Sequence, residues 1–409
     1  MTKDVRELLE ELAREATPSE KPPSSVMGRI ARRQMYTIAT AAASVILLIT
    51  GGLFAVDLVA NRQRTVPPAA DEAGCASGWH LEEPPLESTS FRLEDVAASS
   101  TGDVWAVGTD YANGGALILR YDGDAWIVSD TGVTGSVELR SVDTDSQGNV
   151  WAVGDAGGID PIVLTFDGQQ WHRLPDFPNL GGRNETSLNS VTALGPSDVW
   201  VVGSIGIVED GVSASKPLAM RWDGQDWTSA EVSGRGYLID SAAGPDGSVV
   251  AVGGSQPFIS ATAPRATALI AEWDGQTWAE VTPESTDLEA LGSVDLAGDG
   301  TGWATGGTAL LYFDGAVWTS QETRSLDRAG LGAASSDGDR SWVAGSMGER
   351  PFVAQRSGES WEPVDLPPGP FPRGIINGMT VVGEQVWAVG DSHTLQEDRR
   401  SGLIYRFCP

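Results

Sequence analysis

Residues 103–126 read DVWAVGTDYANGGALILRYDGDAW and contain the pattern that decides the fold. Two apolar runs, one ending at Gly108 and one at Tyr121, are rich in Val, Ile, Leu and Trp and bounded by Gly and Asp, which is typical of β-strands. Asp122-Gly123 follows the second run directly, and Asp-Gly is a strong signal for a tight turn because glycine accepts a positive φ. The stretch therefore predicts neighbouring antiparallel strands, the last of them beginning at Trp126.

The same two signatures recur along the chain. The glycine-ended strand appears as VWAVG, VWVVG, VVAVG, GWATG or SWVAG, in copies that end at Gly108, Gly154, Gly203, Gly253, Gly306, Gly345 and Gly390. A DGxxW segment, or its degenerate form SGESW, follows six of the copies and ends at Trp126, Trp171, Trp227, Trp278, Trp318 and Trp361. Trp105 and Trp387 lie 282 residues and six repeats apart, a mean period of 47. Such a period with strand and turn patterning is typical of β-propellers, and the repeated Trp and Gly are interpreted as packing and turn residues.

One unit is split between the two ends of the periodic region. CASGWHLEEPP, which contains Trp79, resembles the end of a repeat, and the C-terminal SGLIYRFCP resembles the strand that precedes DGxxW. A ring explains the split, because the N-terminal piece can supply the outer strand of the blade that the C-terminus begins. The sequence predicts an all-β, seven-bladed propeller over residues 75–409 with a split last blade.

These units resemble kelch-type propeller repeats, in which an aromatic residue, an acidic turn and a tryptophan follow a glycine-ended strand. Residues 143–154 (DTDSQGNVWAVG) also resemble the propeller repeats of bacterial two-component sensor proteins. The resemblance covers about residues 75–409 and implies a bacterial, membrane-anchored propeller protein. It is specific for the fold and weak for function, because one fold serves many functions.

The chain has two cysteines, Cys75 and Cys408, which flank the proposed splice. The ring model places them opposite each other across the turn between strands three and four of the split blade. We expect a disulfide that locks the ring, and such bonds persist in oxidising compartments.

The N-terminal region predicts a membrane anchor. Residues 35–57 begin with MYTIATAAASVILLITGGLFAV, an uncharged run long enough to form a transmembrane helix, although a cleaved signal peptide is the competing interpretation. Residues 1–34 are expected to form a cytoplasmic tail, in which residues 4–15 make a short amphipathic helix that could dock a cytoplasmic partner. Residues 58–74 are expected to be an extracytoplasmic linker.

The charge balance excludes nucleic acid as a partner. Nine of the 27 basic and seven of the 56 acidic side chains lie in residues 1–64, which leaves 18 and 49 for residues 65–409. Phosphate binding needs clustered Lys and Arg, so this region should repel nucleic acid and anionic lipid.

Binding is expected on one face of the propeller, called here the variable face. It carries the connections between blades and the turns between strands two and three, which include the long segments Ile205–Pro217, Gly254–Thr267 and Asp391–Ser401. The linker enters on the opposite, uniform face, so the variable face should point away from the membrane. The candidate contact residues are Glu209, Asp210, Phe258, Arg265, His393, Glu397, Arg399 and Arg400.

No catalytic, metal or cofactor site is predicted. HExxH, CxxC and GxSxG are absent, and the three histidines are His80, His172 and His393, of which the first two follow repeat tryptophans at equivalent positions. The DTDSQGN segment faintly resembles a Ca²⁺ loop, but a turn is favoured. The leading hypothesis is a non-enzymatic module that binds an envelope protein or glycan outside the cytoplasm. The alternatives are a transmembrane sensor that signals through residues 4–15, and a glycan hydrolase or lyase.

Overall fold

The computed structural model describes residues 75–409 apart from the positions 87–89, 100–101, 159, 175–176, 179–185, 210, 257–264, 286–287, 327 and 395–398. The expected cytoplasmic tail, transmembrane helix and linker therefore lie outside the described residues. Within the described part, no helix is both long and apolar enough to cross a membrane.

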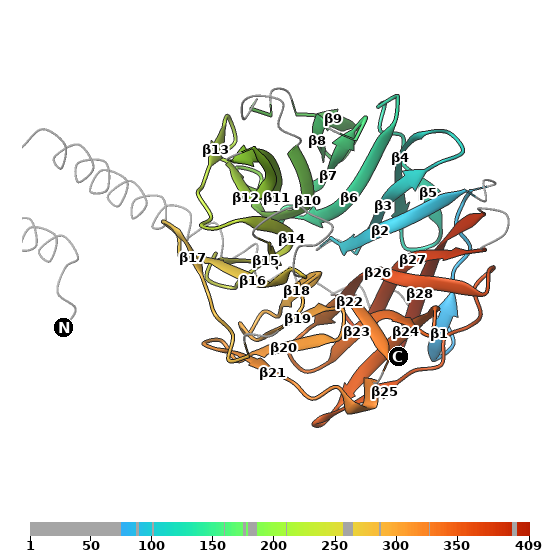
Figure 1. The fold of residues 1–409 in the computed structure, drawn as a ribbon. Coiled ribbons are helices and arrows are strands. Elements are labelled where there is room, and N and C mark those ends of the chain that lie inside the picture. The colour runs from blue at the N-terminus through green and yellow to red at the C-terminus, as the bar shows by residue number, and fades with distance from the viewer. Residues whose placement is uncertain are drawn as a thin grey trace, which may run out of the picture. The chain divides into compact units, whose positions relative to one another are not determined.

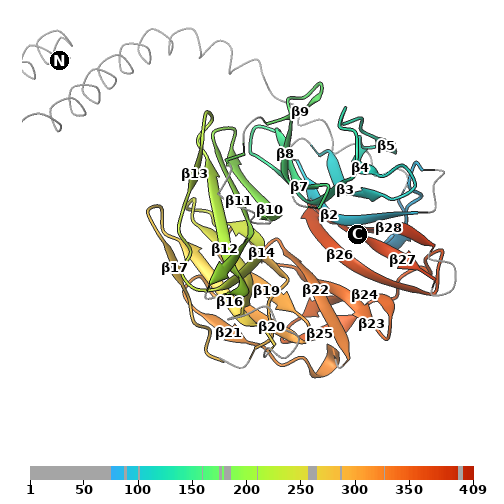
Figure 2. The same ribbon diagram turned by 45° about the horizontal axis from the view of Figure 1, so that its top comes forward.

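Seven four-stranded antiparallel sheets form the blades of a β-propeller (Figures 1 and 2). Blades 1 and 2 are β2 (Phe91–Ala98), β3 (Val104–Asp110), β4 (Gly115–Tyr121), β5 (Trp126–Val128) and β6 (Val137–Thr144), β7 (Val150–Ala156), β8 (Asp160–Phe166), β9 (Trp171–Arg173). Blades 3 and 4 are β10 (Thr186–Gly195), β11 (Asp198–Glu209), β12 (Val212–Trp222), β13 (Trp227–Ser229) and β14 (Gly236–Ala243), β15 (Val249–Ser255), β16 (Thr267–Trp273), β17 (Trp278–Glu280). Blades 5 and 6 are β18 (Ser293–Leu296), β19 (Gly302–Gly306), β20 (Ala309–Phe313), β21 (Trp318–Ser320) and β22 (Ala329–Ser336), β23 (Ser341–Met347), β24 (Arg350–Ser357), β25 (Ser360–Pro363).

Blade 7 confirms the predicted split. It combines β26 (Arg373–Val382), β27 (Gln385–His393) and β28 (Arg400–Cys408) with β1 (Gly78–Leu81) as its outer strand. In Figure 1 the blue β1 lies beside the red β28. The ladder runs from Gly78 opposite Cys408 to Leu81 opposite Tyr405, and the predicted disulfide between Cys75 and Cys408 is present.

Tryptophans join neighbouring blades. The strand-two tryptophan of one blade packs edge-to-face against the strand-four tryptophan of the next, with ring centroids 5.0–5.6 Å apart, in the pairs Trp105–Trp171, Trp200–Trp278, Trp303–Trp361, Trp342–Trp79 and Trp387–Trp126. Trp79 therefore packs against the preceding blade from blade 7, as the DGxxW tryptophan does from the other blades of this series. Edge-to-face packing is the favoured geometry for aromatic pairs, because the ring edge is positive and the face negative.

One expected loop is instead an ordered hairpin. Ile205–Pro217 reads as a long insertion, but β11 and β12 continue through it, and their ladder extends from Val199 opposite Trp222 to Glu209 opposite Val212. The hairpin keeps strand pairing because its residues are mostly β-branched, small or polar with no proline before Pro217. Val208 and Val212, near its tip, are exposed.

Candidate functional site

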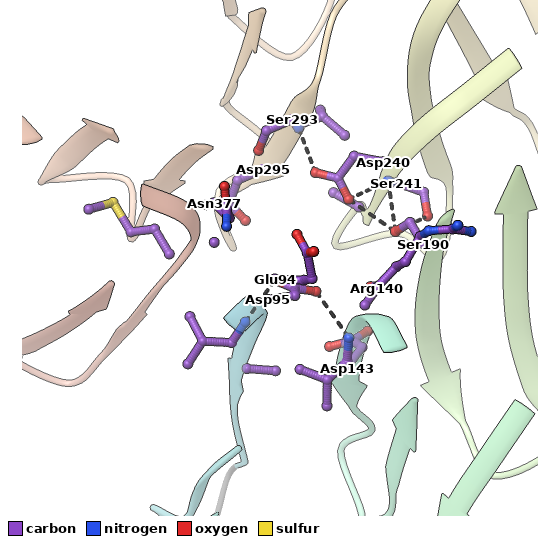
Figure 3. A pocket seen from close by; sticks show the side chains of 18 of the residues that line it. Glu94, Asp95, Arg140, Asp143, Ser190, Asp240, Ser241, Ser293, Asp295 and Asn377 are labelled. Atoms are coloured by element: carbon purple, nitrogen blue, oxygen red, sulfur yellow. Dashed lines mark hydrogen bonds between the residues drawn. The ribbon is translucent and has the colours of Figure 1, made fainter. Parts of the chain in front are cut away.

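A bulge in six of the seven inner strands places side chains at the centre of the ring. In β2, Leu93 pairs with Gly108 and Asp95 pairs with Val107, which leaves Glu94 as the extra residue. The same shift leaves Arg140, Asn189, Ile239, Gly332 and Asn377 extra in their strands. A bulge bends a strand and re-aims a side chain, and Figure 3 shows Glu94, Arg140 and Asn377 approaching the centre from separate blades.

The seven inner strands enclose a central channel of about 930 Å³. Carboxylates line it, and Figure 3 shows Asp95, Asp143, Asp240 and Asp295 around this space. A ring of carboxylates could in principle hold cations, so the decisive question is what their oxygens already contact.

The aspartates bond the next blade. Asp95 accepts the backbone N–H of Val142 at 3.0 Å, and Asp143 accepts that of Ala193 at 2.8 Å. Asp240 and Asp295 do the same for the following blades, through Val294 at 2.9 Å and Ser336 at 2.6 Å. The inner strands of neighbouring blades are not paired in one sheet. Each of these carboxylates therefore accepts a backbone N–H group of the next blade that has no strand partner there.

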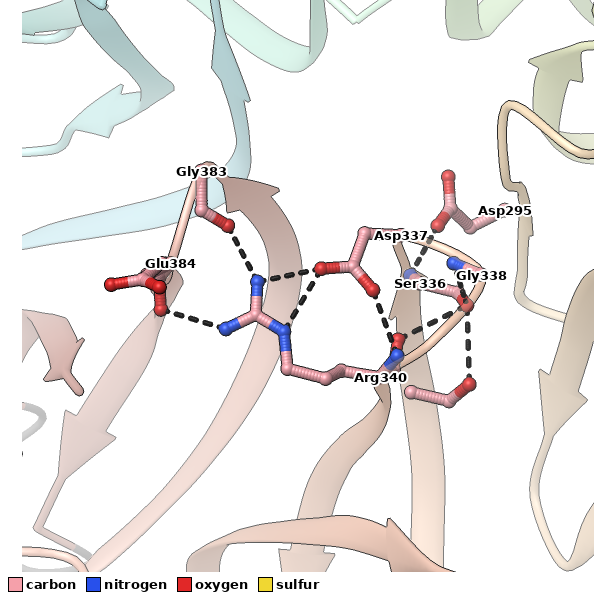
Figure 4. A network of polar contacts seen from close by, with 8 residues as sticks. Asp295, Ser336, Asp337, Gly338, Arg340, Gly383 and Glu384 are labelled. Atoms are coloured by element: carbon pink, nitrogen blue, oxygen red, sulfur yellow. Dashed lines mark hydrogen bonds and ion pairs between the residues drawn. The ribbon is translucent and has the colours of Figure 1, made fainter.

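Neutral side chains make the corresponding contacts elsewhere in the ring. Asn189 donates to the carbonyl oxygen of Leu238 at 2.7 Å, and Asn377 donates to that of Leu93 at 2.8 Å, which joins blade 7 to blade 1. Between blades 6 and 7 the link lies on the uniform face. There Arg340 is paired with Asp337 and donates to the carbonyl oxygens of Gly383 and Glu384 (Figure 4).

Burial changes the proton affinity of the channel carboxyls. It raises the pKa of Asp95 and of Asp143 to about 7 and that of Asp295 to about 6, because desolvation outweighs the backbone N–H groups that favour the charged form. Burial also raises the pKa of Asp240, whose charge in turn raises that of Asp95. The channel aspartates hold the ring together, and this structural role accounts for their position without a bound cation.

A second polar group, the seam cluster, lies beside the channel on the variable face where blades 7 and 1 meet. It consists of Arg92, Glu94, Asp391, His393 and Arg400. The carboxylate of Asp391 has Arg92 Nε at 3.5 Å, His393 Nδ1 at 3.4 Å and Arg400 Nε at 3.4 Å. The Asp391 side chain is only 4 % exposed, whereas each of the three side chains around it is about one third exposed.

The seam cluster leaves buried polar atoms without hydrogen bonds. Asp391 Oδ2, His393 Nδ1 and Thr394 Oγ1 have no hydrogen-bond partner among the described residues, even though Asp391 has cations nearby. An unmade hydrogen bond at a buried group costs about 1–3 kcal/mol. Such a group is a place where a ligand can supply the missing partner.

Aromatic rings flank these charges. The Arg400 guanidinium lies 6.0 Å from the ring centre of Tyr111, which is 43 % exposed, and that of Arg399 lies 5.4 Å from the ring centre of Phe371. The N–H of Tyr111 donates to Ser90 at 2.8 Å, which ties the turn of blade 1 to the edge of blade 7. Exposed rings beside arginines are suited to contact with a peptide.

The structure separates the predicted contact residues. His393 and Arg400 belong to the seam cluster, and Arg399 lies next to it. Arg265 lies apart, at blade 4, where its exposed guanidinium pairs with Glu289 at 2.6 Å. The backbone of Glu209 ends β11, and Asp210, Phe258 and Glu397 lie outside the described residues.

Sequence reasoning missed Arg92 and Asp391. In the sequence, Asp391 counts only as the first residue of the long segment Asp391–Ser401 and is not among the candidate contact residues. One signal was available: Asp155 occupies the equivalent position in blade 2, is also buried and also pairs with an arginine, Arg140. An acidic residue directly after this strand therefore marks a buried ion pair in both blades.

No protein-family model and no curated protein matches this chain. Solved structures do match, and 469 chains share the fold, which shows that the architecture is too widespread to indicate one function. The kelch-like and sensor-like resemblances therefore stay predictions.

Three of the similar structures illustrate how different the proteins with this fold are. "YCF48 bound to D1 peptide" has a TM-score of 0.56 and 19% identity, and the match covers 82% of this chain and 96% of that one. The WD40 β-propeller domain of Doa1 has a TM-score of 0.54 and 14% identity, over 81% of this chain and 97% of that one. Puromycin hydrolase has a TM-score of 0.54 and 17% identity, over 78% of this chain but only 53% of that enzyme. At these identities the likeness shows the propeller fold alone.

Proposed function

We propose that the propeller is a non-enzymatic module that recognises a segment of another protein at the seam cluster. The observation that carries the proposal is the buried carboxylate of Asp391, which is surrounded by partly exposed cations and keeps an oxygen without a hydrogen bond. Arg92, His393 and Arg400 are each about one third exposed, and a peptide offers carbonyl and carboxylate acceptors to them. YCF48 bound to D1 peptide is a propeller of this fold, which is consistent with such a partner.

The partner segment is expected to carry acidic side chains. Arg92, His393 and Arg400 are more exposed than the carboxylate they surround, so a ligand meets these nitrogen donors first. Arg399 and the exposed ring of Tyr111 extend the surface. The rest of the domain is strongly acidic and repels an acidic segment, so its contact is favoured where Arg399 and Arg400 lie.

We further propose that the module is held outside the cytoplasm by residues 35–57, with residues 1–34 on the cytoplasmic side. The support is the uncharged run in the sequence and the Cys75–Cys408 disulfide, which is a bond typical of oxidising compartments. Signalling through residues 4–15 and glycan hydrolysis lack a favouring observation among the described residues.

A random peptide library displayed on phage, selected against the purified full chain, tests the recognition proposal. We expect enriched sequences that contain Asp or Glu and whose binding falls at least tenfold in Arg92→Ala and in Asp391→Asn. Arg120→Ala is the matched control, because Arg120 pairs with Asp103 near the uniform face and should leave binding unchanged. Enrichment that survives both seam variants, or no enrichment at all, would contradict the proposal, and a parallel glycan array tests the glycan alternative.

A further inference from the structure

Within blade 7, the join between β1 and β28, called here the seam, brings together three side chains that can bind metals. Cys75, His80 and Cys408 each place one ligand atom within 4.8 Å of the other two. Cys408 is buried, and Cys75 and His80 are half-buried. In the structure the two sulfurs are joined to each other, so these three residues become a set of metal ligands only after the disulfide is reduced.

We propose that reduction converts the seam into a zinc site with Cys75, Cys408 and His80 as ligands. Two thiolates and one imidazole are a donor set that Zn²⁺ accepts, with the fourth position of its tetrahedron left to water or another ligand. Thiolate and imidazole ligands also disfavour Mg²⁺ and Ca²⁺, which prefer oxygen. The site lies apart from the seam cluster and does not depend on the recognition proposal.

The hydrogen bond of His80 suits this role. Its Nε2 lies 2.5 Å from the carbonyl oxygen of Ala76, which can only accept, so Nε2 carries the proton. The neutral ring then has its lone pair on Nδ1. Histidine ligands commonly donate their other N–H to a carbonyl in this way, which sets the tautomer and the ring orientation.

Contacts other than the disulfide also hold β1 in place. β1 is held by its ladder with β28, and the ring of Trp79 packs 5.6 Å from Trp342 and 5.7 Å from Phe407. Cys75 precedes β1 by three residues. Zinc binding needs a small shift of the two sulfurs, because one S–S bond is replaced by two zinc–sulfur bonds of about 2.3 Å.

The chemistry balances with a thiol reductant. The disulfide takes up two electrons and two protons from a dithiol, which becomes a disulfide, and the protein gains two thiols. Zinc binding then releases both thiol protons, because the thiolate is the ligand. Cys75 and Cys408 are thus joined in both states. The disulfide joins them in the oxidised chain, and the zinc ion joins them in the reduced chain.

Cobalt titration of the full chain tests the site. The chain is reduced with a phosphine, desalted without oxygen and titrated with Co²⁺, whose thiolate charge-transfer and tetrahedral bands report the ligands. We expect one Co²⁺ per reduced chain, displaced by Zn²⁺, and no charge-transfer band in the oxidised chain. His80→Ala should weaken binding at least tenfold and change the tetrahedral bands.

His172→Ala is the matched control. His172 follows Trp171 as His80 follows Trp79, but it bonds Asp167 and belongs to no metal-ligand group among the described residues. Binding should be unchanged in this variant. The proposal is overturned if the reduced chain shows no charge-transfer band, if His80→Ala binds as tightly with the same spectrum, or if near-ultraviolet circular dichroism shows that reduction unfolds the seam.

Discussion

At the residue scale, the glycine that ends each second strand is required by the backbone opposite it, which in six blades is the bulge of the inner strand. A Cβ on Gly108, Gly154, Gly203, Gly253, Gly306, Gly345 or Gly390 would lie only 1.9–2.2 Å from a carbonyl oxygen of that backbone. Real Cβ atoms do not approach so closely, and the atom in the way is backbone, which cannot rotate aside. The glycine therefore permits the bulge, and the bulge brings the side chains of the channel and of the seam cluster to the centre.

Gly203→Ala is expected to lower the free energy of unfolding by about 3 kcal/mol, since the added methyl would overlap the carbonyl oxygen of Ser187. Urea denaturation followed by tryptophan fluorescence measures the change. Gly195→Ala is the control, because a Cβ there has nothing within 4 Å, and its stability should be unchanged or slightly raised. Equal losses in both variants would show that the close contact is not the cause.

The raised pKa of Asp95, Asp143 and Asp295 predicts an unusual pH dependence. A carboxyl whose pKa is higher in the folded chain binds its proton more tightly there, so its contribution is full below the unfolded pKa and is lost as the pH rises through about 6–7. Acidification from about pH 8 to about pH 5 should therefore raise the free energy of unfolding by at least about 1 kcal/mol.

Asp95→Asn should flatten this dependence, because the amide does not titrate, even though it loses one of two backbone hydrogen bonds. Asp274→Asn is the control: that exposed aspartate accepts the N–H groups of Thr277 and Gln276, which lower its pKa. Its ionisation is complete throughout the tested range, so the slope should match the wild type. A wild-type stability that falls on acidification would contradict the assignment.

At the element scale, the split blade depends on a short outer strand, β1. β1 has four residues, yet it completes a sheet and supplies Trp79 to the inter-blade series, and Cys75 of the disulfide lies three residues before it. Its N-terminal position makes it an element that local opening would release first. The covalent bond to Cys408 opposes that release.

Replacing both Cys75 and Cys408 by serine should lower the free energy of unfolding by about 2–4 kcal/mol, because the bond closes a long loop in the unfolded chain. Thermal unfolding by circular dichroism measures the loss. The oxidised wild type treated with a phosphine in metal-free buffer should unfold at the same temperature as the double variant. A wild type that is indifferent to reductant would show that the disulfide adds no stability.

At the scale of the whole molecule, charge is distributed unevenly between the two faces. The uniform face carries acidic turns, in which Asp122, Asp167, Asp223, Asp274 and Asp314 each accept two backbone N–H groups. These bonds lower the pKa of each of the five carboxyls, so the face stays negative well below neutral pH. The arginines of the seam cluster lie on the opposite, variable face.

The full chain should therefore fail to retard duplex DNA in a gel, even at low salt where electrostatic attraction is strongest. The physical reason is the net charge of −29, which repels phosphate over the whole surface. Retardation that weakens steeply with added salt would reveal a basic binding surface and contradict the exclusion of nucleic acid.

The sequence by itself determined the blade number, the split blade and the disulfide, because these follow from a repeat whose period and turn residues are local. It also placed His393 and Arg400 in a loop of the variable face. Only the tertiary structure brought Arg92 to Asp391, which lie 299 positions apart in the chain but meet across the seam. When the ring closes, residues from different blades come into contact, and the geometry of these contacts depends on how far each inner strand bends. The sequence pattern of a single repeat does not predict this bending. The tertiary structure alone also shows the hydrogen bonds between blades in the channel and the close contact between each glycine and the backbone opposite it. It alone shows that the carboxylate of Asp391 keeps an oxygen without a hydrogen bond.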